Sequence, residues 1–437
     1  MIALRPDFAL PEHRAGEPRP WGVRGPALWG PVLANGFALL VALVATATLW
    51  PLYGLFRLRY ARPPVLARWS QVRRYLVQTW TVRPGPPGLS VAQRVWLSEQ
   101  IVWKVALFPV GGLAWLVDEM LDGRALDAVH IERPIFEISA GRSGSTQLAR
   151  YLEADPALVA PSLLQFSFPY RWLWRLVGAT LGRVLSRERV TALFERALPA
   201  EFRERHEGDP FRTDTYDAAL YLNHLNPLGL YLGGEFGAEA FSTSTPTPQW
   251  EEDFVRLLQR TGQKLLLDAP GRRLFVKGHF LAAADALERQ FPDAQFLTMI
   301  RRPEARFQSA INYLRANPID MALGPVPWSW LTAATLRCEI AYCHRERAWF
   351  GVGRPNRCVV RFDDYVRDLQ GTMERVYREC IGTEMPPHVP RTHPPRRRHT
   401  YLLDRSLPDL GVDPAELRAE LVDYEAWCAA EPKIPRP

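Results

Sequence analysis

Short apolar runs alternate with amphipathic stretches from about residue 131 to the end of the chain. The apolar runs predict strands at 134–139, 274–277, 295–300 and 358–362. The stretches between them predict helices at 146–152, at 282–290, from Pro303 onward and at 370–380. Strands that alternate with helices favour a mainly parallel sheet covered by helices on both faces. We therefore predict an α/β domain over residues 131–437.

One part of this domain departs from the alternation. Residues 157–260 are richer in aromatic side chains and follow no regular period. This pattern predicts a helical insertion. Two interpretations stay open, a cap over the substrate or structural filling.

The N-terminal part contains a long apolar segment. No charged residue occurs between Arg24 and Arg57, and Phe37–Phe56 is 20 residues dominated by Leu, Val, Ala, Trp and Phe. At ~1.5 Å per residue, a helix of this length spans a hydrocarbon core of ~30 Å. We predict a membrane anchor at 25–60, preceded by a tail at 1–24 and followed by a juxtamembrane helical region at 61–130.

Two alternatives to an anchor stay open. Ala45-Thr46-Ala47 resembles the cleavage site of a signal peptide, but three acidic residues precede the segment, which also continues beyond that site. A buried hairpin or core helix is the other alternative. A second apolar stretch, Val105–Val117, is only 13 residues long and is expected to be broken by Pro109, Gly111 and Gly112, so we expect it to be interfacial or part of the core.

Basic residues follow the predicted anchor without an acidic one. They are Arg57, Arg59, Arg62, Arg68, Arg73 and Arg74. The positive-inside rule then predicts a single-pass protein whose large C-terminal part is cytoplasmic. If Val105–Val117 also crossed the membrane, this orientation would invert.

Charge narrows the possible partners. The chain of 437 residues carries a net charge of +7, and its pI is near 9.3. The excess comes from scattered arginines, without the long basic block of a nucleic-acid-binding arm. We expect an anionic ligand or a membrane surface as partner, and no nucleic acid. The sequence does not indicate an oligomeric state.

Cysteine use argues against a disulfide framework. The five cysteines lie between Cys338 and Cys428 and include no CxxC pair, which is typical of reduced thiols. No group of His, Cys and carboxylate residues has the spacing of metal ligands, so no metal is expected.

The first predicted strand of the domain leads into a loop suited to an anion. The loop reads Gly141-Arg142-Ser143-Gly144-Ser145-Thr146 and precedes a predicted helix. Small residues let backbone N–H groups converge, the helix dipole favours a negative charge, and Arg142 adds a full positive charge. A Walker loop would place Lys directly after Gly144, where Ser145 stands, so hydrolysis of nucleoside triphosphates is disfavoured.

A second group of residues is predicted at the same edge of the sheet. Lys277-Gly278-His279 ends one predicted strand and Arg301 ends the next, within one βαβ unit. The right-handed crossover brings His279 and Arg301 to the carboxyl edge, where ligands of open α/β sheets bind. Pro303 then begins a helix, and Ser309 lies near enough to share an anion with Arg301.

Together these motifs resemble the sulfotransferases that use 3'-phosphoadenosine 5'-phosphosulfate (PAPS), especially their bacterial branch. Residues 134–146 resemble the 5'-phosphosulfate loop of the family, and Arg301-Arg302-Pro303 with Ser309 resembles its 3'-phosphate motif. Lys277-Gly278-His279 resembles the Lys-x-His that carries the family's base. The resemblance implies a P-loop type of nucleotide-binding fold and PAPS as donor co-substrate.

The resemblance also implies roles for the candidate residues. His279 would be the base, with Lys277 and Arg142 stabilising charge on the transferring group. The residues expected to bind the donor are Gly141, Arg142, Ser143, Gly144, Ser145, Thr146, Arg301 and Ser309. The basic run Arg396–Arg398 is either a clamp over the 3'-phosphate or a solvated turn.

Several residues depart from the family pattern. Ser139 and Gly141 replace the usual Gly and Pro of the loop, and Gln147 replaces a Trp that stacks on adenine. Phe362 stands where a Tyr often contacts adenine. Glu137 is a carboxylate in a strand expected to be buried, so we expect an Arg to pair with it.

The acceptor stays open at this point. A small molecule, a lipid or a carbohydrate with a hydroxyl group each fits a sulfotransferase with a membrane anchor and many Trp and Phe residues. Two other functions also stay open. One is a P-loop kinase for a small molecule, and the other is a catalytically silent, membrane-attached nucleotide-binding protein.

Overall fold

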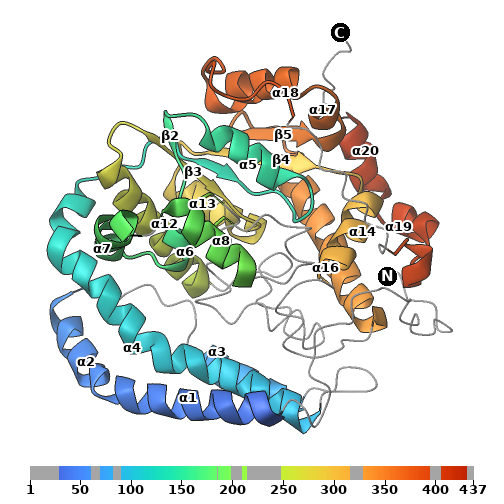
Figure 1. Ribbon diagram of the computed structural model, residues 1–437. Coiled ribbons are helices and arrows are strands. Elements are labelled where there is room, and N and C mark those ends of the chain that lie inside the picture. Colours follow the sequence, from blue (N-terminus) through green and yellow to red (C-terminus); the bar gives the residue numbers. More distant parts are fainter. Residues whose placement is uncertain are drawn as a thin grey trace.

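The computed structural model describes residues 29–60, 69–81, 90–184, 186–197, 209–213, 248–314, 328–393 and 405–430. At its centre lies a five-stranded sheet with the order β2-β3-β1-β4-β5 (Figure 1). The strands are β1 (Ile135–Glu137), β2 (Leu158–Val159), β3 (Arg273–Lys277), β4 (Gln295–Ile300) and β5 (Arg357–Arg361). Each neighbouring pair is parallel, which confirms the predicted fold class.

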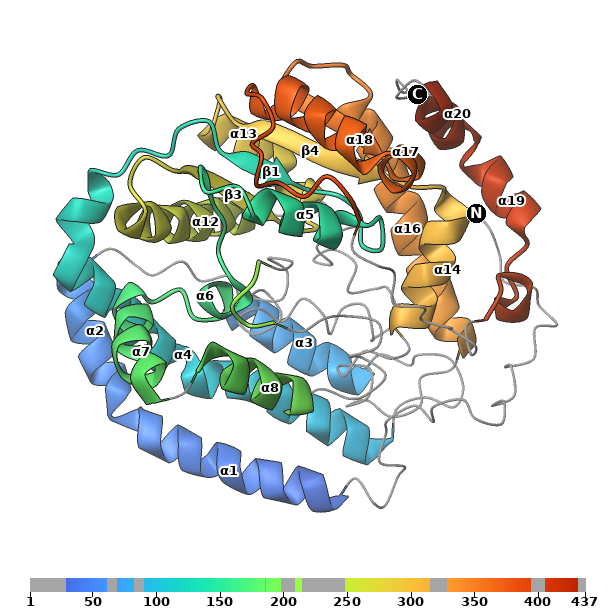
Figure 2. The same ribbon diagram turned by 45° about the horizontal axis from the view of Figure 1, so that its top comes forward.

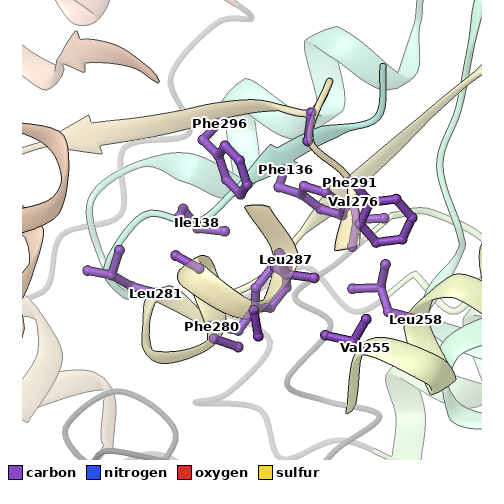
Figure 3. Packing of buried hydrophobic residues seen from close by; sticks show 14 of the residues in the cluster. Phe136, Ile138, Val255, Leu258, Val276, Phe280, Leu281, Leu287, Phe291 and Phe296 are labelled. Atoms are coloured by element: carbon purple, nitrogen blue, oxygen red, sulfur yellow. The ribbon is translucent and has the colours of Figure 1, made fainter. Parts of the chain in front are cut away.

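Consecutive strand residues point to opposite faces of the sheet. Because both sets are apolar here, helices cover both faces. On one face Phe136, Val276 and Phe296 pack against α12 (Pro248–Asp268), α13 (Ala284–Gln290) and α16 (Trp328–Phe350) (Figure 3). On the other face Ile135 and Leu297 pack with α5, α17, α18 and a π-helical turn. The bounds of these elements are Ser145–Glu153, Phe362–Arg367, Leu369–Arg375 and Val376–Ile381. The central strands are therefore buried on both sides, as their apolar sequences predict.

The strand order creates a switch point beside β1. From β1 the chain runs to β2 and β3 on one side, and then crosses to β4 and β5 on the other. The loops that follow β1, β3 and β4 therefore meet at one carboxyl edge, where ligands of such sheets bind.

The remaining C-terminal elements lie around β4 and β5. α14 (Pro303–Leu314) follows β4 and packs against α16, while α19 (Pro414–Glu420) and α20 (Val422–Ala430) pack on α14 and α16 respectively. Two short 3-10 helices are Leu281–Ala283 and Pro408–Leu410.

The predicted insertion, 157–260, is mostly helical where the structure describes it, but it begins with β2, an edge strand of the central sheet, so the expectation of a purely helical segment was wrong there. It contains α6 (Leu163–Ser167), α7 (Arg171–Val184), α8 (Arg187–Ala197) and the first part of α12. Residues 214–247 of the insertion lie outside the described part of the chain.

The N-terminal segment forms helices α1 (Trp29–Ala47), α2 (Leu49–Arg59), α3 (Trp69–Thr81) and α4 (Val91–Asp127). The predicted anchor segment Phe37–Phe56 is divided between α1 and α2, which are separated at Thr48. By length and composition alone, α1 and α4 are both long and apolar enough to cross a membrane.

Val105–Val117 corrects one expectation from the sequence. We expected Pro109 and the two following glycines to break this stretch, but it lies inside α4, a continuous helix of 37 residues. Aromatic side chains pack closely against the glycines. A Cβ atom on Gly112 would lie 2.6 Å from the Tyr53 ring, and one on Gly111 would lie 2.9 Å from the Tyr170 hydroxyl. Tertiary packing therefore outweighs the low helix propensity of this stretch.

Candidate active site

The loop between β1 and α5 is held in a tight turn. The Ser143 hydroxyl donates a hydrogen bond of 2.7 Å to the Ala140 carbonyl. Gly144 has φ of 100°, and a Cβ atom there would lie 2.9 Å from the Phe362 ring and 3.0 Å from Met299 Sδ. Only glycine fits this position. The turn brings the loop to the N-terminus of α5, whose first N–H groups have no partner within the helix.

Arg142 meets the two residues of the second predicted phosphate motif. Its Nε donates to Ser309 Oγ at 3.2 Å, and its backbone carbonyl accepts from Arg301 Nη1 at 2.7 Å. The Arg142 guanidinium also lies over the Tyr313 ring, 4.7 Å from its centroid. Residues after β1, after β4 and on α14 therefore converge, as the sequence predicts.

Positive charge accumulates at this point. Burial lowers the pKa of the Arg301 guanidinium below its usual value, and the neighbouring charge of Arg142 lowers it further. The Arg301 guanidinium lies 4.6 Å from the centroid of the Phe362 ring. Two guanidinium groups this close favour an anion between them.

Lys277 and His279 lie beside the same loop. Lys277 is fully buried at the end of β3, in register with Glu137 of β1. A Cβ atom on Gly141 would lie 3.7 Å from His279 Cε1 and 3.8 Å from its Nε2. His279 is therefore in van der Waals reach of the loop that carries Arg142. A larger residue at 141 would contact the imidazole.

Glu137 has different neighbours from those expected. We predicted an arginine partner, but the nearby basic side chains are Lys277 and His279. Its Oε1 accepts hydrogen bonds from the Ser139 hydroxyl and, at 3.3 Å, from the Ser139 N–H. The Ser139 hydroxyl also accepts from the Met299 N–H at 2.7 Å. Ser139, noted only as a departure from the family loop, links β1 to β4.

The carboxyl group of Glu137 makes stability depend on pH. Burial raises its pKa above the usual 4.5, although Lys277 and Ser139 act in the opposite direction. Because the folded-state pKa exceeds the unfolded-state value, the stability that Glu137 contributes is largest below pH 4.5. That stability is lost as pH rises through the folded-state pKa.

We expect Glu137→Gln to remove this pH dependence. Thermal unfolding midpoints are measured for both proteins from pH 4.5 to neutral pH. The midpoint of the variant minus that of wild type should become more positive as pH rises, because only wild type loses the contribution of Glu137. Glu132→Gln makes the same chemical change at an exposed position and should follow wild type. A constant difference between Glu137→Gln and wild type over this range would contradict the prediction.

Three supporting residues were not found from the sequence. Tyr342 of α16 donates to the Ile138 carbonyl at 2.6 Å, just before the loop. Tyr313 lies beneath Arg142, and Arg306 of α14 is fully buried. No local pattern marks these residues, because their partners are distant in sequence. For Arg306 alone the sequence held a signal: it follows Arg301 by five residues, so both lie near the start of the helix that begins at Pro303.

Arg306 joins α14 to α16 and α20. It donates to Glu339 Oε2 at 2.7 Å, to Glu346 Oε2 at 3.1 Å and to the Tyr424 hydroxyl at 3.2 Å. Glu346 Oε1 in turn accepts from Thr298 Oγ1 of β4 at 2.5 Å. This buried network fixes α14, and hence Ser309, relative to β4 and Arg301.

The basic run Arg396–Arg398 lies outside the described residues. Among the residues that the structure does describe, no group of three or more His, Cys, Asp or Glu side chains could hold a metal ion.

The fold and site define an α/β protein whose central strand leads through a glycine-containing loop to a sheet edge where arginine side chains gather. The model of the sulfotransferase family matches residues 134–387, more than half of the chain. The chain therefore belongs to the sulfotransferase family.

Solved structures show the same fold. STF1, a sulfotransferase of Mycobacterium tuberculosis H37Rv, is 20% identical with a TM-score of 0.61, over 81% of this chain and 92% of that chain. STF9, a sulfotransferase of Mycobacterium avium, is 16% identical with a TM-score of 0.65, over 86% of this chain and 95% of that chain. No curated protein sequence matches. At these identities, the likeness to the solved structures is one of fold.

Proposed function

We propose that this protein transfers a sulfuryl group from PAPS to a hydroxyl group of an acceptor. The observation that carries the proposal is the convergence of Arg142, Ser309 and Arg301 at one sheet edge. Positive groups from both motifs at one edge suit a ligand that carries more than one anionic group. Their spacing along the chain follows the order of the two family motifs.

Each residue has a role in this proposal. The loop amides, Arg142, Ser143, Ser145 and Thr146 hold the 5'-phosphosulfate, and Arg301 with Ser309 holds the 3'-phosphate. His279 takes the proton from the acceptor hydroxyl as its oxygen bonds to sulfur. Lys277 and Arg142 stabilise the charge that stays on the bridging oxygen when its bond to sulfur breaks.

The acceptor in this proposal is a small molecule, a lipid or a carbohydrate that bears a hydroxyl group. Membrane association through the N-terminal helices is part of the proposal, with the catalytic domain at the cytoplasmic face, as the arginines from Arg57 to Arg74 predict. Such a position favours acceptors that are held in or near a bilayer.

Transfer of labelled sulfonate tests the reaction. We expect wild-type protein to move the label from PAPS to lipid or carbohydrate acceptors. Transfer of labelled phosphate from ATP instead would identify a kinase. Tight binding of PAPS without turnover on any acceptor would identify a silent binding protein.

Arg301→Ala tests the 3'-phosphate role separately. Loss of a charged hydrogen-bond donor should weaken binding of adenosine 3',5'-bisphosphate about 10- to 100-fold, measured by calorimetry. Arg302→Ala is the matched control, because that side chain is 74% exposed and makes only a 3.9 Å ion pair with Asp363. Equal affinity of Arg301→Ala and wild type would contradict the assigned role.

A further inference from the structure

The outer face of α1 is apolar and has no protein partner among the described residues. Leu33, Phe37, Leu40 and Val44 follow each other at spacings of four, three and four, so they share one face of the helix. Leu33 and Phe37 are each 70% exposed, and Val44 is 68% exposed. Figures 1 and 2 both show α1 at the outer edge of the molecule, with α4 between it and the sheet.

The inner face of α1 packs along α4, and the two helices run parallel. Near the start of both, Val32 shares a buried cluster with Ala92. Further along, Asn35 Nδ2 donates to Glu99 Oε2 at 2.7 Å. Beyond α1, Tyr53 of α2 lies against Gly112. Contacts at higher residue numbers in α1 and α2 are thus made with higher residue numbers in α4, as expected for parallel helices.

α3 runs in the opposite direction beside α4. Near its start, the Trp69 ring lies 6.3 Å from that of Trp50. Near its end, Trp80 Nε1 donates to Ser98 Oγ at 3.0 Å. α3 has 13 residues, including Arg73 and Arg74. A helix of that length extends ~20 Å, which is less than the ~30 Å of a hydrocarbon core.

This packing is incompatible with α1 crossing a bilayer. A crossing α1 would bring Glu99 of α4 to its own depth, together with Arg73 and Arg74 of α3. Such residues are among the least favourable in hydrocarbon. α3 would also have to return through the membrane, for which it is too short.

α4 is also fixed to the catalytic domain. Asp118 of α4 forms a 2.9 Å ion pair with Lys264 of α12, and both side chains are completely buried. Arg260 of α12 pairs with Glu119, one residue further along. The C-terminal part of α4 therefore belongs to the catalytic core, and α1 lies beneath that core.

The charge of the N-terminal helices suits an anionic surface. The described helices α1, α2 and α3 contain Arg57, Arg59, Arg73 and Arg74 and no Asp or Glu. Trp29, Trp69 and Trp80 are exposed on the same helices. Basic and tryptophan side chains are typical of helices that lie at a membrane interface.

We infer that α1 and the exposed Leu52, Leu55 and Leu58 of α2 insert into one leaflet of an anionic bilayer without crossing it. Both ends of the chain then lie on the same side of the membrane, in place of the single crossing that the apolar segment alone predicts. This inference concerns attachment and does not depend on the proposed sulfuryl transfer.

The positions of the two chain ends test the inference directly. The full-length protein, tagged at both ends, is expressed in cells, and sealed membrane vesicles are treated with protease. We expect both tags to be digested from the same side. Tags on opposite sides would show a crossing and overturn the inference. So would loss of the N-terminal tag by cleavage after α1.

Substitution of the outer face tests which surface inserts. The double variant Phe37→Asp, Val44→Asp should bind vesicles of phosphatidylcholine and phosphatidylserine at least about tenfold more weakly than wild type. Wild type should also bind vesicles of phosphatidylcholine alone more weakly. Val352→Asp, at a 63% exposed position after α16, is the matched control and should bind like wild type.

Circular dichroism and the rate of sulfonate transfer to a soluble acceptor should be unchanged in the double variant. If the double variant binds anionic vesicles as tightly as wild type, or if wild type does not bind them, the inference is wrong. The protease experiment uses wild-type sequence, so a folding defect in the variant leaves that test intact.

Discussion

His279→Ala is expected to lower kcat for sulfonate transfer about 10²- to 10⁴-fold, the usual contribution of a general base. The imidazole lies beside the loop that carries Arg142, at the edge where the proposed donor would bind. Without it, the acceptor hydroxyl would have to lose its proton to water. Arg301 and Ser309, to which the 3'-phosphate is assigned, both contact Arg142, so affinity for adenosine 3',5'-bisphosphate should stay within a few-fold of wild type.

Steady-state transfer of labelled sulfonate and calorimetry with the bisphosphate measure the two quantities. His388→Ala is a suitable control, because His388 is exposed and has no role in the proposed site. Full activity in His279→Ala would show that the base has been assigned to the wrong residue. A loss of bisphosphate binding equal to the loss of rate would indicate a structural role instead.

Arg306→Met is expected to lower the free energy of unfolding by about 3–5 kcal/mol. The substitution keeps most of the side-chain volume but removes the positive charge. The buried carboxylate of Glu346 then has no cationic partner. Both side chains of this ion pair are completely buried. Leaving one buried charge unpaired is among the most destabilising changes that a single substitution makes.

Urea unfolding at neutral pH measures this loss. Arg302→Met provides the control on the exposed surface, where a change within about 0.5 kcal/mol is expected. The double variant Arg306→Met, Glu346→Gln should recover part of the loss, since it removes the unpaired charge. If the double variant is less stable than the sum of the single changes, the ion pair is not the cause.

The arrangement of the catalytic domain followed largely from its sequence. Buried parallel strands are short and apolar, so β3, β4 and β5 stood out within a residue or two of their bounds. Because parallel strands end at a common edge, the meeting of Arg142 with Arg301 could be predicted without knowing any side-chain position. Gly144 was identified as part of the loop from the local pattern of small residues between a predicted strand and a predicted helix.

Contacts between distant segments could not be predicted. The environment of Glu137 on β1 depends on Lys277, which is paired with it on the adjacent strand β3 but lies 140 residues later in the sequence. Tyr342 and Glu346 support the site from α16, a helix whose own sequence does not mark it as part of a site. Pro109 and the glycines after it suggested a broken segment, because their packing against Tyr53 and Tyr170 is not visible in sequence.

The support that α16 gives to both halves of the site has a kinetic consequence. Tyr342 holds the segment before the loop, and Glu346 holds β4 and α14, so the position of the loop relative to Arg301 and Ser309 is set before any ligand arrives. In the proposed reaction, a preformed site would bind the bisphosphate product through many of the same contacts as the PAPS donor. Contacts that are equally strong before, during and after transfer do not speed the chemical step. Departure of the spent nucleotide would then limit turnover, and added bisphosphate would inhibit at concentrations near its Kd.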